Sequence, residues 1–341
     1  MSTDVEQVPR PDDVQEIDPA AQLRWTEEFW NEPEEAGTEL IRAGVLIEGQ
    51  ITTFEGHYEQ GKTAVMIDVA RQWIEMGRPV IYLDYEMGKR RVKRRMKDNR
   101  WGPAHLEWWH YEYMPTLQPG HLNALMAMVP PHPLIAVDSY SQAMMYLARE
   151  ENSATEAGNW WVTELQGARE AGATVLVIDQ VVKSATSRDR YAGRGTGAKS
   201  FGTDVKWFVE RYEKFTPTQS GLVKLTLLKD REGVMPQAKG FIVGDGEGHL
   251  TVTETEPPKG NPIDDQAVEA VVNVLEVEGW SSPTAVKQKT EGYGDQTIRS
   301  VLQYLESKGI LQSRPRQGKG GGTEYNIADT DQRAADVPAL D

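Results

Sequence analysis

One loop constrains the fold of this chain more than any other feature. Residues 56–63 read Gly-His-Tyr-Glu-Gln-Gly-Lys-Thr and fit the pattern G-x-x-x-x-G-K-[ST], which wraps phosphate groups. An apolar run, 51–54, precedes the loop and a helical pattern, 63–76, follows it. In such a strand–loop–helix setting backbone N–H groups face an anion, Lys62 reaches the β- and γ-phosphates, and the Thr63 hydroxyl binds Mg²⁺. The loop therefore predicts a site for ATP and Mg²⁺.

The variable positions of this loop carry bulky side chains, whereas phosphate loops usually carry small ones there. Glu59 is also acidic, and it would have to face away from the phosphates or towards a neighbouring subunit. We nevertheless predict that the whole loop binds the nucleotide. The predicted cofactor-binding residues are Gly56, His57, Tyr58, Glu59, Gln60, Gly61, Lys62 and Thr63.

Strand and helix patterns alternate along the first two thirds of the chain. Apolar runs at 51–54, 80–83, 134–137 and 175–178 are separated by helical patterns such as 63–76 and 153–170. This alternation predicts an α/β fold with a mostly parallel central sheet flanked by helices on both faces. Three later strand patterns, 204–213, 222–228 and 240–253, are expected to extend the sheet in the antiparallel sense.

Composition shifts divide the chain into five parts. We expect a disordered acidic N-terminus (1–20), an ATPase domain (21–254), a Pro- and Gly-rich linker (255–263), a small domain (264–328) and a disordered polar tail (329–341). The small domain shows three helical patterns, the last of them capped by Asp295, and then two strands around a glycine-rich turn. That order predicts a winged helix-turn-helix.

Composition also limits the cellular setting and the partners. The chain has no cysteine and no apolar run long enough to cross a membrane, and its first residues are acidic, so we expect a cytoplasmic protein. The net charge of −15 is uneven, because residues 1–40 hold twelve acids and two bases while residues 89–100 hold eight bases and one acid. A basic run of this kind could bind a phosphate backbone or form an ordinary solvated helix face.

Acidic residues follow two further predicted strands. Asp138 ends the apolar run 134–137, and we expect it to bind Mg²⁺ from a strand that neighbours the phosphate loop. Asp84 and Glu86 end the run 80–83, and either could orient the attacking water. Strand alternation places both on one face, so spacing alone leaves this choice open.

These motifs together resemble the RecA-fold ATPases of the DnaB and RepA hexameric helicase group, which includes phage-encoded relatives. The resemblance is carried by residues 56–63, by Leu-Asp-Tyr-Glu-Met at 83–87, by Asp138 and by Lys-Asp-Arg-Glu-Gly at 229–233. It implies that Glu86 is the catalytic carboxylate and that Gln180 senses the γ-phosphate. It also implies that Lys229 and Arg231 reach the ATP of the neighbouring subunit. The predicted catalytic set is Glu86, Lys62, Gln180, Lys229 and Arg231.

The segment that follows Gln180 is basic and glycine-rich, and it contains one aromatic residue, Tyr191. In RecA-fold rings the corresponding loops line a central channel that holds single-stranded DNA, and basic groups with aromatics suit that task. A merely solvated loop is the alternative. The predicted DNA contacts here are Arg188, Arg190, Arg194 and Lys199.

The small domain supplies a second group of predicted DNA contacts: Arg299, Arg314 and Arg316. Residues 266–327 hold seven bases and seven acids, so this domain could also dock on a protein. The aromatic stretch 101–113 is expected to pack on the sheet rather than to stack on bases.

The sequence thus predicts an oligomeric ATPase that couples Mg-ATP hydrolysis to DNA translocation and unwinding, or to recombination. Its partners would be DNA and further copies of itself in a ring or filament, with no membrane contact. Two alternatives remain: a strand-exchange recombinase, and a winged-helix DNA-binding regulator whose assembly is set by ATP without motor activity.

Overall fold

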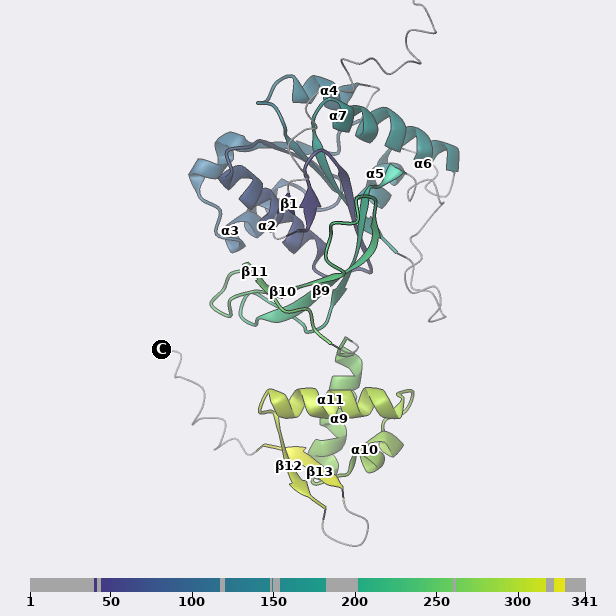
Figure 1. Ribbon diagram of the computed structural model, residues 1–341. Helices are drawn as coiled ribbons and strands as arrows, with labels where there is room; N and C mark the ends of the chain where they lie inside the picture. The colour runs from purple at the N-terminus through teal and green to yellow at the C-terminus, as the bar shows by residue number, and fades with distance from the viewer. Residues whose placement is uncertain are drawn as a thin grey trace, which may run out of the picture. The chain divides into compact units, whose positions relative to one another are not determined.

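In the computed structural model the described residues are 40–41, 44–116, 120–147, 149, 154–181, 202–259, 262–316 and 322–328. A nine-stranded sheet forms the centre of the larger part, with the order β11-β10-β9-β8-β3-β7-β6-β4-β5 (Figure 1). A two-residue pairing of β1 (Leu40–Ile41) with β2 (Leu46–Ile47) precedes it. The expected α/β fold with a mostly parallel sheet is confirmed.

The parallel part of the sheet begins with the strands that were expected from apolar runs. These are β3 (Ile51–Gly56), β4 (Val80–Asp84), β6 (Leu134–Asp138) and β7 (Thr174–Gln180), and every residue in them is buried. The aromatic stretch forms a short 3-10 helix, η2 (Pro103–Trp108), and the edge strand β5 (Trp109–Tyr113). The ring of Trp109 lies 4.9 Å from that of Tyr82 in the adjacent strand, so these aromatics pack on the sheet as expected.

The later strands extend the sheet, with one difference from expectation. β8 (Val205–Arg211) pairs with β3 in parallel, and only β9 (Gly221–Asp230), β10 (Ala238–Val243) and β11 (Val252–Thr255) continue antiparallel. Parallel neighbours need a crossover of about a dozen residues or more, and the interval between β7 and β8 is long enough to provide it.

Helices cover both faces of the sheet and bury two separate cores. On one face α2 (Lys62–Glu75) and α3 (Lys89–Asp98) pack with residues such as Val92 and Met96. On the other lie α4 (His121–Met126), α5 (Tyr140–Tyr146) and a helix made of α6 (Ala154–Trp160), the π-helical η3 (Trp161–Gln166) and α7 (Gly167–Glu170) (Figure 1). The expected helix 63–76 corresponds to α2.

Residues 262–328 have a core of their own. They comprise α9 (Asp265–Glu278), α10 (Pro283–Lys289), α11 (Asp295–Ser307) and the antiparallel pair β12 (Leu311–Pro315) and β13 (Thr323–Ile327). Asp295 does not cap α11 as expected: Gly294 occupies the N-cap, and the Asp295 carboxylate accepts a 2.7 Å hydrogen bond from Arg299 one turn later. Within the described ranges no helix has both the length and the apolar composition needed to cross a bilayer.

Candidate active site

Four parallel strands end at one edge of the sheet and bring the predicted nucleotide-binding residues together. Gly56 at the end of β3 pairs with Gln180 at the end of β7, and Asp84 at the end of β4 pairs with Asp138 at the end of β6. β7 lies between β3 and β6, so Asp138 is not on the strand next to the phosphate loop as expected. The residues still meet, because the Thr63 hydroxyl donates to Asp138 Oδ2 at 3.1 Å.

Two glycines give the phosphate loop its shape. A Cβ at Gly56 would lie 2.4 Å from the carbonyl oxygen of Val209 in β8, so only glycine fits there. Gly61 has a φ of +91° and directly precedes α2, whose N-terminus no side chain caps. The unpaired N–H groups of the first helical turn therefore point into the space where a phosphate would bind.

The bulky residues of the loop are accommodated without closing it. The edge of the His57 ring faces Phe208, and His57 Nδ1 lies 3.3 Å from the carbonyl oxygen of Val181. Gln60 Oε1 accepts a 2.7 Å hydrogen bond from the backbone N–H of Arg211. These two side chains fasten the loop to neighbouring strands, whereas Tyr58 and Glu59 are exposed.

Lys62 is buried at the start of α2 and bends back over its own loop. Its ammonium group donates to the carbonyl oxygens of Gly56 at 2.8 Å and His57 at 2.6 Å. Burial lowers the pKa of Lys62 to about 8, although the nearby Asp138, Glu86 and Asp179 act in the opposite direction. An anionic phosphate in the loop would compensate this burial and favour the charged form.

Asp138 and Thr63 have the chemistry and the placement of a Mg²⁺ site. Burial and the nearby Glu86 raise the pKa of Asp138 to about 7, while hydrogen bonds from Tyr82 and Thr63 lower it. Tyr82 and Thr63 both donate to Oδ2, and Oδ1 is buried with no hydrogen-bond partner among the described residues. A hard cation that prefers oxygen ligands would satisfy this oxygen and stabilise the ionised carboxylate.

The structure separates the roles of Asp84 and Glu86, which strand alternation left open. Asp84 is buried, and its carboxylate accepts hydrogen bonds from the backbone N–H groups of Glu86, Met87 and Gly88 and from the Tyr111 hydroxyl, at 2.7–3.0 Å. The strand ends at Asp84, so the two acids do not share a strand face as expected. Glu86 is exposed and lines the cavity at the phosphate loop, so only Glu86 is available to a bound ligand.

Gln180 lies at the end of β7, beside the phosphate loop. Its side chain is buried, and its Oε1 has no hydrogen-bond partner among the described residues. Gln180 also lines the same cavity as Lys62, Glu86 and Asp138. An amide in this place could contact the terminal phosphate of a bound nucleotide.

Lys229 and Arg231 do not join this group. Val205 pairs with Asp230 and also with Thr52, so the end of β9 lies at the edge of the sheet where β3 begins, opposite the phosphate loop. There Lys229 Nζ donates to the Thr203 carbonyl oxygen at 2.5 Å, and Arg231 pairs with Asp204 at 3.1 Å. Neither residue can act on the nucleotide of its own subunit.

The cavity at the phosphate loop has a volume of about 690 Å³ and contains residues that sequence reasoning missed. Helix α3 contributes arginines to its wall, and the hairpin between β8 and β9 contributes a lysine and an aromatic ring. The signal was present as the basic run 89–100, but only the helical position relative to α2 decides which bases face the cavity. The missed residues are Arg91, Arg94, Arg95, Lys214 and Phe215.

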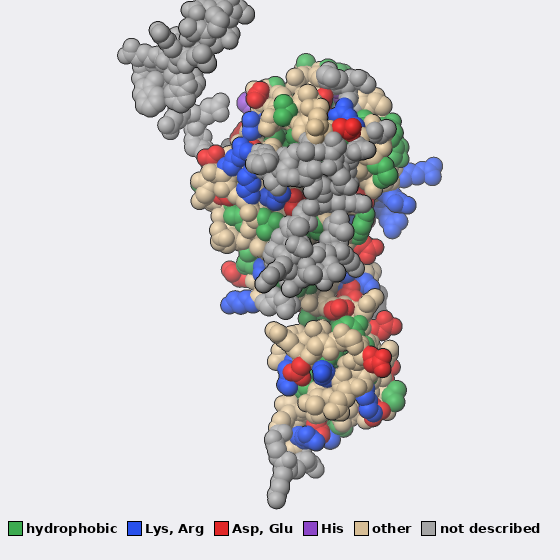
Figure 2. Space-filling model, turned by 90° about the vertical axis from the view of Figure 1, so that its right-hand side faces the viewer, with side chains coloured by type: hydrophobic (Ala, Val, Ile, Leu, Met, Phe, Trp, Pro, Cys, Tyr) green, Lys and Arg blue, Asp and Glu red, His purple; other side chains and the backbone are tan. Residues whose placement is uncertain are grey.

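The predicted DNA contacts are only partly described. Arg188, Arg190, Arg194 and Lys199 lie outside the described residues, as do residues 1–20 and 329–341. Arg299 pairs with Asp295, Arg314 pairs with Glu324 at 3.1 Å and stacks on Trp280, and Arg316 lies 3.9 Å from Glu324. On the face of this small unit drawn in Figure 2, acidic and basic side chains are interspersed rather than gathered in one patch.

Comparison with known proteins identifies the larger domain. Residues 17–186 match the family model AAA_25, described as an AAA domain. No curated protein matches the sequence. Solved structures that resemble the chain include the ATPase domain of a DnaB-like helicase, with 13% sequence identity, a TM-score of 0.47, and coverage of 60% of this chain and 85% of that chain. The family match, together with the parallel sheet and its phosphate loop, identifies this part of the chain as a RecA-like P-loop ATPase domain of the AAA_25 family.

Proposed function

We propose that this protein is a Mg-ATP hydrolase that assembles with further copies of itself and couples hydrolysis to movement along, or unwinding of, DNA. The observation that carries the catalytic part is the position of Glu86. It is the exposed carboxylate in the cavity that also holds Lys62, Thr63 and Asp138. Every group that hydrolysis requires of one subunit therefore has a residue in place.

The roles follow from the chemistry of each side chain. Lys62 and the N–H groups at the start of α2 hold the phosphates, and Thr63 with Asp138 would hold Mg²⁺, which neutralises charge on the phosphate oxygens when bound. Glu86 accepts the hydrogen bond of a water molecule and orients it towards the terminal phosphate. Gln180 contacts that phosphate and passes its presence to the segment that follows β7.

The site is completed by a neighbouring subunit. Lys229 and Arg231 lie at the sheet edge opposite their own phosphate loop, which suits residues that act on the nucleotide of another copy. Their positive charge would stabilise the charge that develops on the transferred phosphate. This arrangement supports a ring or filament as the active form.

A DNA-directed activity is supported by the basic segment after Gln180 and by the three helices and two strands of residues 264–328, which we propose form a winged helix after a linker at 255–263. Arg299, Arg314 and Arg316 are exposed, and their ion pairs with acids are of the weak surface kind. Phosphate groups could therefore displace those acids at low cost.

Steady-state phosphate release from ATP, with and without single-stranded DNA, tests the proposal. We expect turnover that requires Mg²⁺ and rises several-fold with DNA, while Glu86→Gln binds ATP normally and loses about 100-fold or more in turnover. Full turnover in Glu86→Gln would remove Glu86 from the mechanism. ATP binding without DNA-stimulated turnover in the wild type would instead favour the non-motor regulator, and long filaments on DNA in electron micrographs would favour the recombinase.

A further inference from the structure

One face of α3 follows the wall of the nucleotide cavity. Arg91, Arg94, Arg95 and Asp98 recur at helical spacing and line the cavity, while Val92 and Met96 on the other side of the helix are buried in the core. Among the described residues none of the three arginines pairs with an acid. Their guanidinium groups are therefore not committed to structural ion pairs.

A second wall of the cavity faces the nucleotide from the β8–β9 hairpin. Lys214, Phe215 and Pro217 line it, and the Phe215 ring lies directly beside the phosphate loop, since a Cβ at Gly61 would lie 3.3 Å from this ring. An aromatic ring and guanidinium planes on the two walls of one cavity are the side chains that stack on flat aromatic ligands.

One turn fixes both walls. The backbone N–H of Gly248 donates to the Pro217 carbonyl oxygen of the hairpin at 2.9 Å. Two residues later, Leu250 N–H donates to the Asp98 carbonyl oxygen at 2.7 Å, and Asn99 Nδ2 donates to the Leu250 carbonyl oxygen at 3.1 Å. Because the same short turn holds the hairpin and the end of α3, the spacing between the two walls is set before any ligand arrives.

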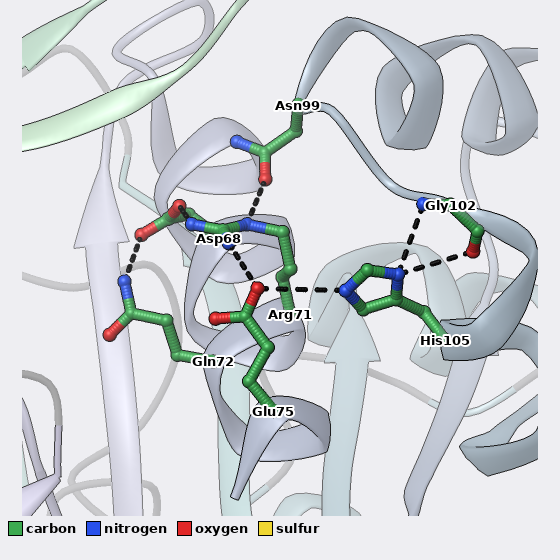
Figure 3. Close-up of polar contacts among 7 residues, drawn as sticks. All are labelled: Asp68, Arg71, Gln72, Glu75, Asn99, Gly102 and His105. Carbon is green, nitrogen blue, oxygen red and sulfur yellow. Dashed lines mark hydrogen bonds and ion pairs between the residues drawn. The ribbon is translucent and has the colours of Figure 1, made fainter.

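The polar contacts shown in Figure 3 hold α3 against α2 as well. Arg71 in α2 donates from Nε to Asn99 Oδ1 at 3.1 Å and pairs with Asp68 and Glu75 of its own helix at 3.0 and 2.5 Å. Asp68 is buried and also accepts a hydrogen bond from Gln72, so the Arg71 side chain is held from several sides (Figure 3). The phosphate loop at the start of α2 and the arginine face of α3 are thus parts of one rigid frame.

We infer that the arginine face of α3 and Phe215 form the subsite for the nucleoside part of the nucleotide, within the subunit that holds its phosphates. This inference rests on the proposed function and adds the groups that recognise the rest of the ligand. The phosphate loop and Lys62 already account for the phosphates, and Glu86 and Asp138 account for the reacting end. The base then lies between guanidinium groups of Arg94 and Arg95 and the ring of Phe215.

Isothermal titration of the full-length protein with Mg²⁺ and either AMP-PNP or inorganic tripolyphosphate tests this inference. The variant Arg94→Ala/Arg95→Ala removes two bases from the cavity wall. The matched control Lys93→Ala/Lys97→Ala removes the same charge from the exposed side of the same helix. We expect the arginine variant to bind AMP-PNP about tenfold more weakly than the control, while tripolyphosphate binding differs between them by less than about threefold.

A third variant separates charge from stacking. Arg94→Lys/Arg95→Lys keeps both charges but loses both guanidinium planes, so its AMP-PNP affinity should fall between those of the wild type and the alanine variant. Equal AMP-PNP affinities for the arginine variant and its control would overturn the inference, and so would an equal loss of tripolyphosphate binding. Normal AMP-PNP binding with these expected losses, in a protein without ATP turnover, would contradict the proposed function alone.

Discussion

At the scale of single residues, burial decides which of several similar side chains can do chemistry. Asp84 and Glu86 are two residues apart and both carry carboxylates, but the first is enclosed by four hydrogen-bond donors and the second is exposed in the cavity. The buried carboxylate shapes the turn that presents the exposed one. Loss of Asp84 should therefore affect stability and activity together, in contrast to loss of the Glu86 charge.

We predict that Asp84→Ala lowers the free energy of unfolding by about 2–4 kcal/mol, because three backbone N–H groups and the Tyr111 hydroxyl lose a charged acceptor. ATP turnover should fall as well, since the turn no longer holds Glu86. Urea unfolding and phosphate release measure the two effects. Glu107→Gln, at an exposed acid, is the control and should change neither. An Asp84→Ala protein as stable as the wild type would show that this turn does not depend on the carboxylate.

Asp138 links the nucleotide site to stability. Its pKa in the folded protein is raised to about 7 from an ordinary value of 3.8, so the folded state binds more protons than the unfolded chain between these values. Its contribution to the stability of the nucleotide-free protein is therefore largest below pH 4 and is lost as the pH rises to about 7. The ionised, buried carboxylate is the form that Mg²⁺ would require.

We predict that Asp138→Asn raises the Tm of the nucleotide-free protein at pH 8 by about 2–6 °C, because the amide keeps an acceptor for Thr63 and Tyr82 without a buried charge. The gain should shrink as the pH falls from about 7 to about 4, while ATP turnover is lost at all pH values. Thermal unfolding across this pH range measures the difference. A gain that does not vary with pH would mean that Asp138 titrates as an ordinary carboxyl group.

At the scale of structural elements, close approach of backbones determines where the phosphate loop can form. β3 ends at Gly56, where β8 passes so near that the Val209 carbonyl oxygen leaves no room for a side chain. The helix segment α7 begins with Gly167, which has no atom within 4 Å of an added Cβ. The same residue type thus has opposite requirements in the two elements.

We predict opposite effects for the two glycine-to-alanine substitutions. Gly56→Ala should destabilise the protein by more than about 2 kcal/mol and weaken ATP binding, because β3 and β8 must move apart. Gly167→Ala should stabilise it by about 0.5–1 kcal/mol through helix propensity, with ATP binding unchanged. Chemical denaturation and ATP titration compare them. If Gly56→Ala were neutral, the approach of these two strands would be looser than the structure indicates.

At the scale of the whole molecule, one subunit does not contain all the groups that the proposed mechanism uses. Arg231 is anchored by Asp204, which also binds Arg169 at 3.3 Å and the backbone N–H of Ile51 at 2.9 Å. This cluster holds Arg231 at the sheet edge where β3 begins. The position is incompatible with action on the same subunit's nucleotide and compatible with action on a neighbour's.

We predict that Arg231→Ala and Glu86→Gln proteins, each nearly inactive alone, regain turnover when mixed. An Arg231→Ala subunit has an intact nucleotide site, and a Glu86→Gln subunit can supply the missing arginine. Phosphate release should therefore exceed the sum of the separate activities, and native mass spectrometry should detect mixed assemblies. Arg169→Ala, which alters the same cluster without removing Arg231, should stay active alone. Mixed assemblies without any excess activity would place Arg231 outside the reaction.

The sequence by itself determined the parts of the fold that depend on local pattern. Apolar runs that end in Asp138 and Gln180 appear as buried parallel strands, and the phosphate loop lies between a strand and a helix, because β-periodicity, helix periodicity and glycine spacing are properties of short segments. The order of these segments placed their ends at one sheet edge. The choice of Lys62, Thr63 and Asp138 needed no more than this.

Only the tertiary structure decided which side chains share a cavity. The direction of β8, the enclosure of Asp84, the distance of Arg231 from its own phosphate loop and the arginine face of α3 all depend on contacts between segments far apart in the chain. A basic run looks the same whether it faces solvent or a nucleotide. What distinguishes the two is the packing of Val92 and Met96 against the core, which turns the arginines towards the phosphate loop.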